Sequence, residues 1–378
     1  MPYGYFLTVV LIAVCTIAAL FAPRKPFWVG RLSFLFGLVV SEIPQIVGLF
    51  LVLSTVLAFV EGNLVGVSGA AAVTVATAIL LGLTVVAWRA VRSRDVVLGS
   101  LRDAGLHASP AGWRANWQSL IAPLPIKPGS VRRTANLRYG AHRRQRLDVY
   151  RRSDTESGPL LVYLHGGGYF SGGKHREARA LLYRLAARGW VCISADYRLR
   201  PGAGFPDHLA DARSAVAWAH SHASEFGGDP STLVMAGGSA GAHLTALCAL
   251  DQQGDVAGGE NGTRIDAAVC LYGYYGRYYG RGPQEHPVST PLMLDATQAP
   301  PFFIAHGAYD GYVPVASARA LVDHLRAQSP SPVAYAELPY AQHAFDLFYS
   351  WRSAAVTDGV EAFLDRVLST KEVSSCAS

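Results

Sequence analysis

Residues 232–243 read Thr-Leu-Val-Met-Ala-Gly-Gly-Ser-Ala-Gly-Ala-His, and they place Ser239 inside a GxSxG pattern. The apolar run 232–236 is typical of a buried strand, and the stretch 240–250 has a helical pattern. A serine at such a sharp turn needs small neighbours, because side chains there collide with the strand and the helix. The stretch predicts an exposed, nucleophilic Ser239. Taken alone, it also fits a loop of small residues.

Strand-like and helix-like stretches alternate on both sides of this turn. Further apolar runs occupy 160–164, 190–195, 267–271, 302–305 and 333–338, and helical patterns occupy 175–187, 208–224 and 316–327. Such alternation is typical of βαβ units and a mostly parallel sheet flanked by helices. We therefore expect one α/β domain over residues 131–378.

A second glycine cluster follows the first of these apolar runs. Residues 165–168 read His-Gly-Gly-Gly, and an unhindered glycine run can direct several backbone N–H groups at one oxyanion. The expected oxyanion hole consists of the N–H groups of Gly167, Gly168 and Ala240, with His165 and Gly166 supporting the loop.

The same loop offers a competing interpretation. Residues 168–174, Gly-Tyr-Phe-Ser-Gly-Gly-Lys, match the spacing of a phosphate-binding GxxxxGK loop. His175 stands where that loop needs a serine or threonine to hold Mg²⁺, so we reject a nucleotide site.

Two further polar residues follow the last two apolar runs. Asp310 comes after the run 302–305, and His343 comes after the run 333–338. Ligands collect outside the carboxyl ends of strands in such sheets, so both side chains are expected near Ser239. The prediction is a triad in which Ser239 attacks, His343 acts as the base and Asp310 orients His343. Asp346 is a rival acid, and His243 and His306 are expected to be structural.

From about residue 146 onward, the chain resembles the hormone-sensitive-lipase-like group of α/β-hydrolase esterases, and more narrowly its membrane-anchored actinobacterial carboxylesterases. The motifs that carry the resemblance are LDVY at 147–150, HGGG at 165–168, DYRL at 196–199, GGSAG at 237–241, DGYVP at 310–314 and QHAF at 342–345. The resemblance implies an α/β-hydrolase fold and a serine carboxylesterase or lipase without a cofactor. One departure bears on substrate preference: the group often has GDSAG, and Gly238 replaces that aspartate.

Other functions use the same residues. Amide or formamide hydrolysis and acyl transfer between lipids need the same triad, and a hydrolase-like fold can also serve as a catalytically silent sensor. A small-molecule or lipid ester is the expected substrate. Aromatic residues that follow the glycine loop and the run 267–271 are candidates for its pocket: Tyr169, Tyr272, Tyr274 and Tyr275. The tyrosine-rich stretch 272–282 also fits a structural aromatic loop.

The first quarter of the chain has a different composition. Residues 1–88 carry five of the 60 charged side chains, and they predict an anchor of three transmembrane helices over about 4–22, 43–61 and 64–88. The stretch 28–41 is expected to lie in the membrane interface or to extend a tilted helix. Glu42 is either a functional intramembrane carboxylate or a headgroup-level residue beside Pro44.

Charge is uneven along the chain as well. The formal charge is +1 for 1–88, +9 for 89–150 and −4 for 151–378, which gives the total of +6. The positive charge thus concentrates around a connector, 89–130, with amphipathic patterns at 97–106 and 113–121, and we therefore expect no nucleic-acid partner. The arginines of the connector are either solvated or in contact with anionic membrane lipids. Basic residues lie in the loop after the first span and after the third span, whereas the loop between the second and third spans holds only Glu61. This asymmetry predicts an outside N-terminus and a catalytic domain on the cytoplasmic side of the cell membrane.

Metal and disulfide chemistry are not expected. The five cysteines have no paired spacing of the kind that holds a metal or builds a disulfide framework. The sequence makes no prediction of oligomeric state.

Overall fold

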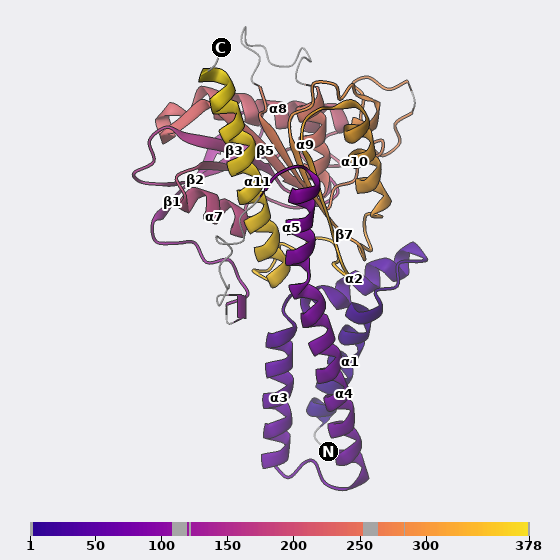
Figure 1. Ribbon diagram of the computed structural model, residues 1–378. Coiled ribbons are helices and arrows are strands. Elements are labelled where there is room, and N and C mark those ends of the chain that lie inside the picture. Colours follow the sequence, from indigo (N-terminus) through magenta and orange to yellow (C-terminus); the bar gives the residue numbers. More distant parts are fainter. Residues whose placement is uncertain (1–2, 108–118, 121, 252–263, 283, 377–378) are drawn as a thin grey trace.

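The computed structural model describes residues 3–107, 119–120, 122–251, 264–282 and 284–376. Within these residues, the chain forms an eight-stranded sheet with the order β1-β2-β4-β3-β5-β6-β7-β8 (Figure 1). The strands are β1 (Val131–Arg138), β2 (Arg146–Arg152), β3 (Gly158–Leu164), β4 (Val191–Ala195), β5 (Gly228–Gly238), β6 (Ala267–Leu271), β7 (Phe302–Gly307) and β8 (Val333–Leu338). β2 pairs antiparallel with β1 and β4, and the remaining neighbours are parallel. The predicted mostly parallel α/β sheet is confirmed.

Helices cover both faces of this sheet. One face packs against α8 (Phe205–Ser221), α9 (Ala240–Leu250) and α10 (Ala316–Gln328). The other face packs against α5 (Ser93–Asp103), α7 (Arg179–Ala187) and α11 (Trp351–Cys376). Because the central strands are buried on both faces, they read in the sequence as continuous apolar runs.

The N-terminal part forms four helices: α1 (Tyr3–Phe21), α2 (Phe27–Glu42), α3 (Pro44–Val60) and α4 (Gly66–Val91). Tyr3–Phe21 and the stretch Gly66–Asp103 are long and apolar enough to cross a membrane, and α2 with α3 is a pair bent by 85° that adds a third candidate. Pro44 begins α3, where its missing N–H is tolerated at a helix start but would break a continuous helix. These helices suggest membrane anchoring.

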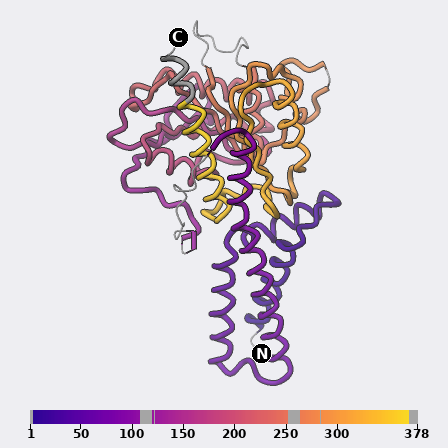
Figure 2. The backbone as a smooth tube through the Cα atoms, in the orientation of Figure 1, coloured from indigo at the N-terminus to yellow at the C-terminus, as the bar shows by residue number. Residues whose placement is uncertain are grey.

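Figures 1 and 2 show α1, α3 and α4 projecting from one end of the sheet domain. The N-terminus and the turn between α3 and α4 lie at the far end of this bundle. The connection between α1 and α2 lies next to the sheet domain, and α2 runs along the base of that domain. The bundle therefore meets the sheet domain through α2 and through the C-terminal end of α4.

The segment expected to be a connector contributes to the core. α5, which contains the first amphipathic pattern, follows α4 almost without a break, and its Val97 and Leu101 are fully buried in the cluster formed with β8 and α11. The second pattern, 113–121, lies outside the described residues except for 119–120.

Glu42 lies in the contact between the two parts of the chain. Its carboxylate is fully buried, 3.0 Å from Nη1 of Arg352, and it accepts a hydrogen bond of 2.7 Å from Oγ of Ser350. Arg352 also donates to the Ser41 carbonyl over 2.6 Å. Ser350 and Arg352 lie just before and at the start of α11. The two alternatives considered for Glu42, a functional intramembrane carboxylate and a headgroup-level residue, did not include this ion pair.

Candidate active site

Ser239 lies at the turn from β5 to α9 in a strained conformation. Its φ of 53° and ψ of −115° are rare for a residue with a side chain. Backbone bonds hold this conformation, because the Ser239 N–H donates to the Leu271 carbonyl over 2.9 Å and the His243 N–H donates to the Ser239 carbonyl over 3.1 Å. Gly241 packs so closely on the Leu164 carbonyl that a side chain at 241 would overlap it. The serine is thus raised at the carboxyl edge of the sheet.

The structure brings Ser239, His343 and Asp310 together. Nε2 of His343 lies 3.0 Å from Oγ of Ser239, and Nδ1 of His343 lies 2.6 Å from Oδ2 of Asp310. The three side chains come from the carboxyl ends of β5, β7 and β8 and are nearly buried. These distances are those of a nucleophile, its base and the acid that orients the base.

Hydrogen bonds fix the Asp310 carboxylate. Its Oδ1 accepts from the N–H groups of Tyr312 and Val313 over 2.8 and 2.7 Å, and Nε2 of His306 lies 3.3 Å from its Oδ2. Burial alone raises the pKa of Asp310, but the charge of His343 and the hydrogen bonds from His306 and His343 outweigh it. The pKa of Asp310 therefore lies well below its ordinary value, and the group is ionised.

Aromatic rings surround the His343 imidazole. Tyr312 stacks on it with ring centroids 5.6 Å apart, and Tyr272 approaches edge-on at 4.9 Å. A third ring, Phe34 of α2, approaches edge-on at 6.3 Å. Sequence reasoning missed Phe34, because nothing near it resembles a motif.

The glycine loop lies beside Ser239. Gly167 and Gly168 have φ of 112° and 60°, which glycine adopts without strain. In the described part of the chain, their N–H groups have no hydrogen-bond acceptor. A Cβ on Gly166 would lie 2.9 Å from Cβ of Ser239, so this loop can approach the serine only without side chains. Ala240 begins α9, where N–H groups have no partner within the helix.

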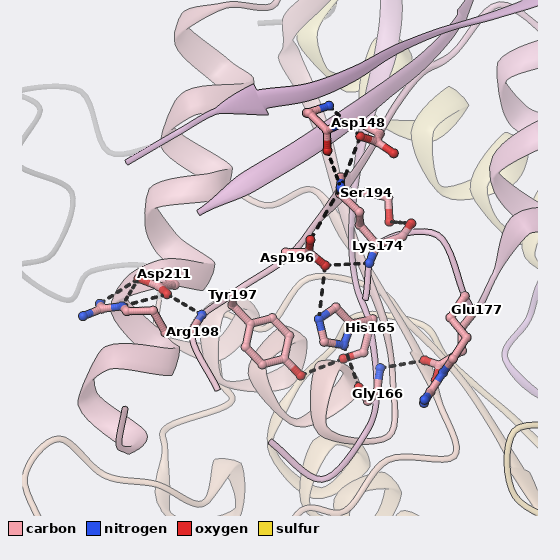
Figure 3. A network of polar contacts seen from close by, with 12 residues as sticks. Asp148, His165, Gly166, Lys174, Glu177, Ser194, Asp196, Tyr197, Arg198 and Asp211 are labelled. Carbon is pink, nitrogen blue, oxygen red and sulfur yellow. Dashed lines mark hydrogen bonds and ion pairs between the residues drawn. The ribbon is translucent and has the colours of Figure 1, made fainter. Parts of the chain in front are cut away.

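Buried charges support this loop from behind (Figure 3). Glu177 accepts a hydrogen bond of 2.6 Å from the Gly166 N–H. Nδ1 of His165 lies 2.6 Å from the Gly166 carbonyl, its ring stacks on Tyr197, and burial lowers the pKa of His165. His165 therefore acts within the loop as a neutral ring. Glu177 was missed, since a lone glutamate before a helix carries no sequence signal.

Lys174 belongs to the same buried network. Its Nζ donates to Oδ1 of Asn136 over 2.9 Å and lies 3.6 and 3.5 Å from the carboxylates of Asp148 and Asp196 (Figure 3). The lysine of the GxxxxGK-like stretch is thus held by carboxylates, in agreement with the rejection of a nucleotide site.

Asp346 lies apart from the triad. It accepts a bond of 2.5 Å from the hydroxyl of Tyr272 and one of 3.0 Å from the Ala178 N–H. Burial and the nearby charge of Glu177 raise the pKa of Asp346 to about 7. Its position does not suit it to orient His343.

Two tyrosines explain the glycine in the GGSAG motif. A Cβ on Gly238 would lie 2.7 Å from the hydroxyl of Tyr272 and 2.8 Å from that of Tyr163. The place that the aspartate of GDSAG would need is therefore filled by these hydroxyls.

The expected pocket residues lie in different surroundings. Tyr169 is buried, with its hydroxyl 2.6 Å from Nδ1 of His243, and Tyr272 and Tyr275 are fully buried. Tyr274 is 43% exposed, which leaves its side chain accessible to a ligand.

The remaining candidate groups have structural partners. Nε2 of His243 lies 2.7 Å from the Ser289 carbonyl, and burial lowers the pKa of His243 to about 4. Among the described residues, no group of three or more His, Cys, Asp or Glu side chains is arranged to hold a metal ion.

Comparison with known proteins decides the family. The chain is 38% identical over 328 residues to the probable carboxylic ester hydrolase LipM of Mycobacterium tuberculosis, a match that covers 76% of each chain. The chain belongs to this family of α/β-hydrolase esterases. Esterase LipQ of the same organism is 33% identical, with 73% of this chain and 75% of LipQ covered. The family model BD-FAE matches residues 147–276.

Solved structures agree with the fold of this esterase. Thermogutta terrifontis esterase 2, phosphorylated by paraoxon, aligns with a TM-score of 0.55 and 25% identity, covering 63% of this chain and 95% of that one. A truncated carbohydrate esterase from gut microbiota aligns with a TM-score of 0.55 at 20% identity, covering 63% and 99%, and supports the fold alone. The resemblance stated from the motifs, and the α/β-hydrolase fold that it implied, are confirmed.

Proposed function

We propose that this chain is a membrane-anchored serine hydrolase that cleaves carboxylic esters through Ser239, His343 and Asp310. The observation that carries the proposal is the chain of contacts from Asp310 to His343 (2.6 Å) and from His343 to Ser239 (3.0 Å), with the serine on a strained turn. The family of carboxylic ester hydrolases supports the reaction class.

In the first half of the reaction, Oγ of Ser239 attacks the ester carbonyl carbon while Nε2 of His343 takes its proton. The N–H groups of Gly167, Gly168 and Ala240 would hold the oxyanion of the tetrahedral intermediate. Collapse of this intermediate breaks the bond to the alcohol oxygen. The alcohol leaves with the proton from His343, and the acyl group stays on Ser239.

In the second half, His343 takes a proton from water, which attacks the acyl-enzyme. The carboxylic acid leaves, and the proton returns to Ser239. In both halves the imidazole becomes positively charged, and the ionised Asp310 stabilises it. The two N–H groups that bond Asp310 keep its carboxylate oriented toward His343.

Replacement of the nucleophile tests the proposal. We expect Ser239→Ala to lower kcat for p-nitrophenyl butyrate by about 10⁴-fold or more and to abolish labelling by a fluorophosphonate probe. Ser221→Ala, a substitution on the outer surface of α8, provides the control and should leave both unchanged. Hydrolysis by Ser239→Ala at the rate of the unaltered protein would refute the triad.

We also propose that residues 1–88 form a three-span anchor, that 89–130 connects it to the catalytic domain 131–378 while its helix α5 packs into the core of that domain, and that this domain lies on the cytoplasmic side. Arg24 and Arg89 support this orientation, because both lie at the end of the bundle that meets the catalytic domain. Arg24 donates to the Ala308 carbonyl over 2.7 Å, and Arg89 lies 3.9 Å from the ring centre of Tyr340. Basic residues remain on the cytoplasmic side of spans.

Reporter fusions test this orientation. We expect a fluorescent protein fused after Ser378 to fluoresce and alkaline phosphatase at the same place to be inactive. In the turn at Asn63, between α3 and α4, the phosphatase should be active. Active phosphatase at the C-terminus would overturn the assignment.

A further inference from the structure

Helix α2 connects the apolar N-terminal bundle to the two loops that carry Asp310 and His343. Oγ of Ser33 lies 3.5 Å from Nε2 of Gln342, the residue before His343, and Gln342 also accepts a bond of 3.2 Å from the Gly311 N–H. Backbones also meet directly, because a Cβ on Gly311 would lie 2.5 Å from the Gly30 carbonyl oxygen. α2 is therefore part of the wall around the catalytic histidine.

One aromatic side chain of α2 reaches the histidine itself. The Phe34 ring lies edge-on to Tyr312 at 4.8 Å and to His343 at 6.3 Å. Phe34 is half-buried, and Tyr312 stacks on the imidazole, so these two rings form an apolar boundary on this side of the triad.

The side of α2 that faces away from the triad is apolar and exposed. Its large side chains, between 41% and 65% exposed, are Trp28, Leu32, Leu35, Phe36 and Val39. The guanidinium of Arg31 lies 4.5 Å from the ring centre of Phe27 and 5.3 Å from that of Tyr312. An apolar face with aromatic and arginine side chains is typical of a helix that lies in the membrane interface. The 85° bend into α3 agrees with this placement.

With α2 in the membrane interface, the width of one helix would separate the triad from the lipid. A helix with its side chains is about 10 Å wide, which is shorter than an extended long acyl chain. An ester whose acyl chain stays in the bilayer can then present its carbonyl to Ser239 along α2. A short, water-soluble ester gains nothing from this face.

We propose that the substrate is a long-chain ester resident in the adjoining membrane leaflet, and that Phe34 and the apolar face of α2 select it. This inference rests on the proposed function. The helix that carries the inference is α2, because its Phe34 is in contact with His343.

Two substrates that share the same leaving group distinguish recognition of the acyl chain from the chemical step. The full chain is reconstituted in phosphatidylcholine vesicles, and kcat/KM is measured for p-nitrophenyl palmitate dissolved in the vesicles and for p-nitrophenyl butyrate in the buffer. Phe34→Ala and Leu35→Glu should each lower the palmitate-to-butyrate ratio about tenfold. Val65→Glu places the same charge at an exposed apolar position at the far end of the bundle and should leave the ratio unchanged.

The outcomes distinguish this inference from the proposed function. A ratio that stays within about twofold of the unaltered protein in both α2 variants would overturn the role of α2, as would an equal fall in Val65→Glu. Failure of the triad would instead appear as butyrate hydrolysis by Ser239→Ala. The two hypotheses can therefore fail separately.

Discussion

Two buried carboxyls, Asp310 bonded to His343 and Asp346 three residues after His343 in the chain, have pKa values shifted in opposite directions. Asp310 receives two N–H groups and faces two imidazoles, and its pKa lies well below the ordinary value. Asp346 is buried near Glu177, and its pKa is raised to about 7. In the sequence both are candidate partners of His343, because Asp310 follows a strand-like run and Asp346 is three residues after the histidine. Only the neighbours in the folded structure distinguish Asp310, the ionised partner of His343, from Asp346, which binds a proton more readily.

The raised pKa of Asp346 predicts a pH-dependent stability. A group with a folded-state pKa of about 7 and an ordinary value near 4 binds its proton more tightly in the native state. Its stabilising contribution to the free energy of unfolding is largest below pH ~4 and decreases as the pH rises to ~7, by a few kcal/mol at most. Above that pH the contribution no longer changes. The neutral Asp346→Asn should therefore reduce the loss of stability between pH 5 and pH 8.

Thermal unfolding of the detergent-solubilised full chain at these two pH values measures this effect. Buried histidines such as His243, with a pKa of about 4, contribute a slope of the opposite sign below pH ~6.5. The diagnostic is therefore the difference between the variant and the unaltered protein, which removes these shared contributions. Asp295→Asn, at an exposed carboxyl, is the control. An unchanged pH dependence in Asp346→Asn would contradict the assignment.

At the scale of elements, local patterns predicted β3 to β8 but neither β1 nor β2, although β2 is largely buried. The apolar runs 160–164, 232–236 and 302–305 became parts of β3, β5 and β7 because strands buried on both faces must be apolar throughout. β1 escaped prediction because it is an edge strand whose residues, apart from Val131, are mostly exposed. Its sequence, VRRTANLR, lacks the alternation of apolar and polar residues that is typical of a half-buried strand.

Contacts between segments far apart in the sequence limited how much of the site could be predicted. The proximity of Ser239, Asp310 and His343 was predictable, because each follows a strand end in the order that the motifs imply. Glu177 was not, since its role depends on its distance of 2.6 Å from the Gly166 N–H. The same holds for α2, whose Gly30 meets Gly311 across most of the chain length. Helix α7 begins at Arg179 rather than at 175, and the preceding Glu177 and Ala178 bond the glycine loop and Asp346.

For the whole molecule, the packing of α5 joins part of the predicted connector 89–130 to the core of the sheet domain. α5 belongs in sequence to the basic connector, yet Val97 and Leu101 are fully buried with β8 and α11. Cγ1 of Val97 occupies the space that a Cβ on Gly359 of α11 would need. The charge pattern did not indicate this, because the buried side of α5 is narrow and its other side is polar.

Truncated chains test where the catalytic domain begins. Burial of Val97 and Leu101 stabilises the domain by about 3–6 kcal/mol, at roughly 1.5–3 kcal/mol for each side chain. A domain of this kind is stable by only about 5–15 kcal/mol, so this loss is a large share of the total. We expect residues 92–378 to unfold cooperatively in thermal denaturation, and residues 131–378 to unfold at a much lower temperature or to aggregate. Equal unfolding temperatures would contradict a structural role for the segment that contains α5. Because both chains lack α1–α4, the difference between them reports on that segment and not on the loss of the anchor.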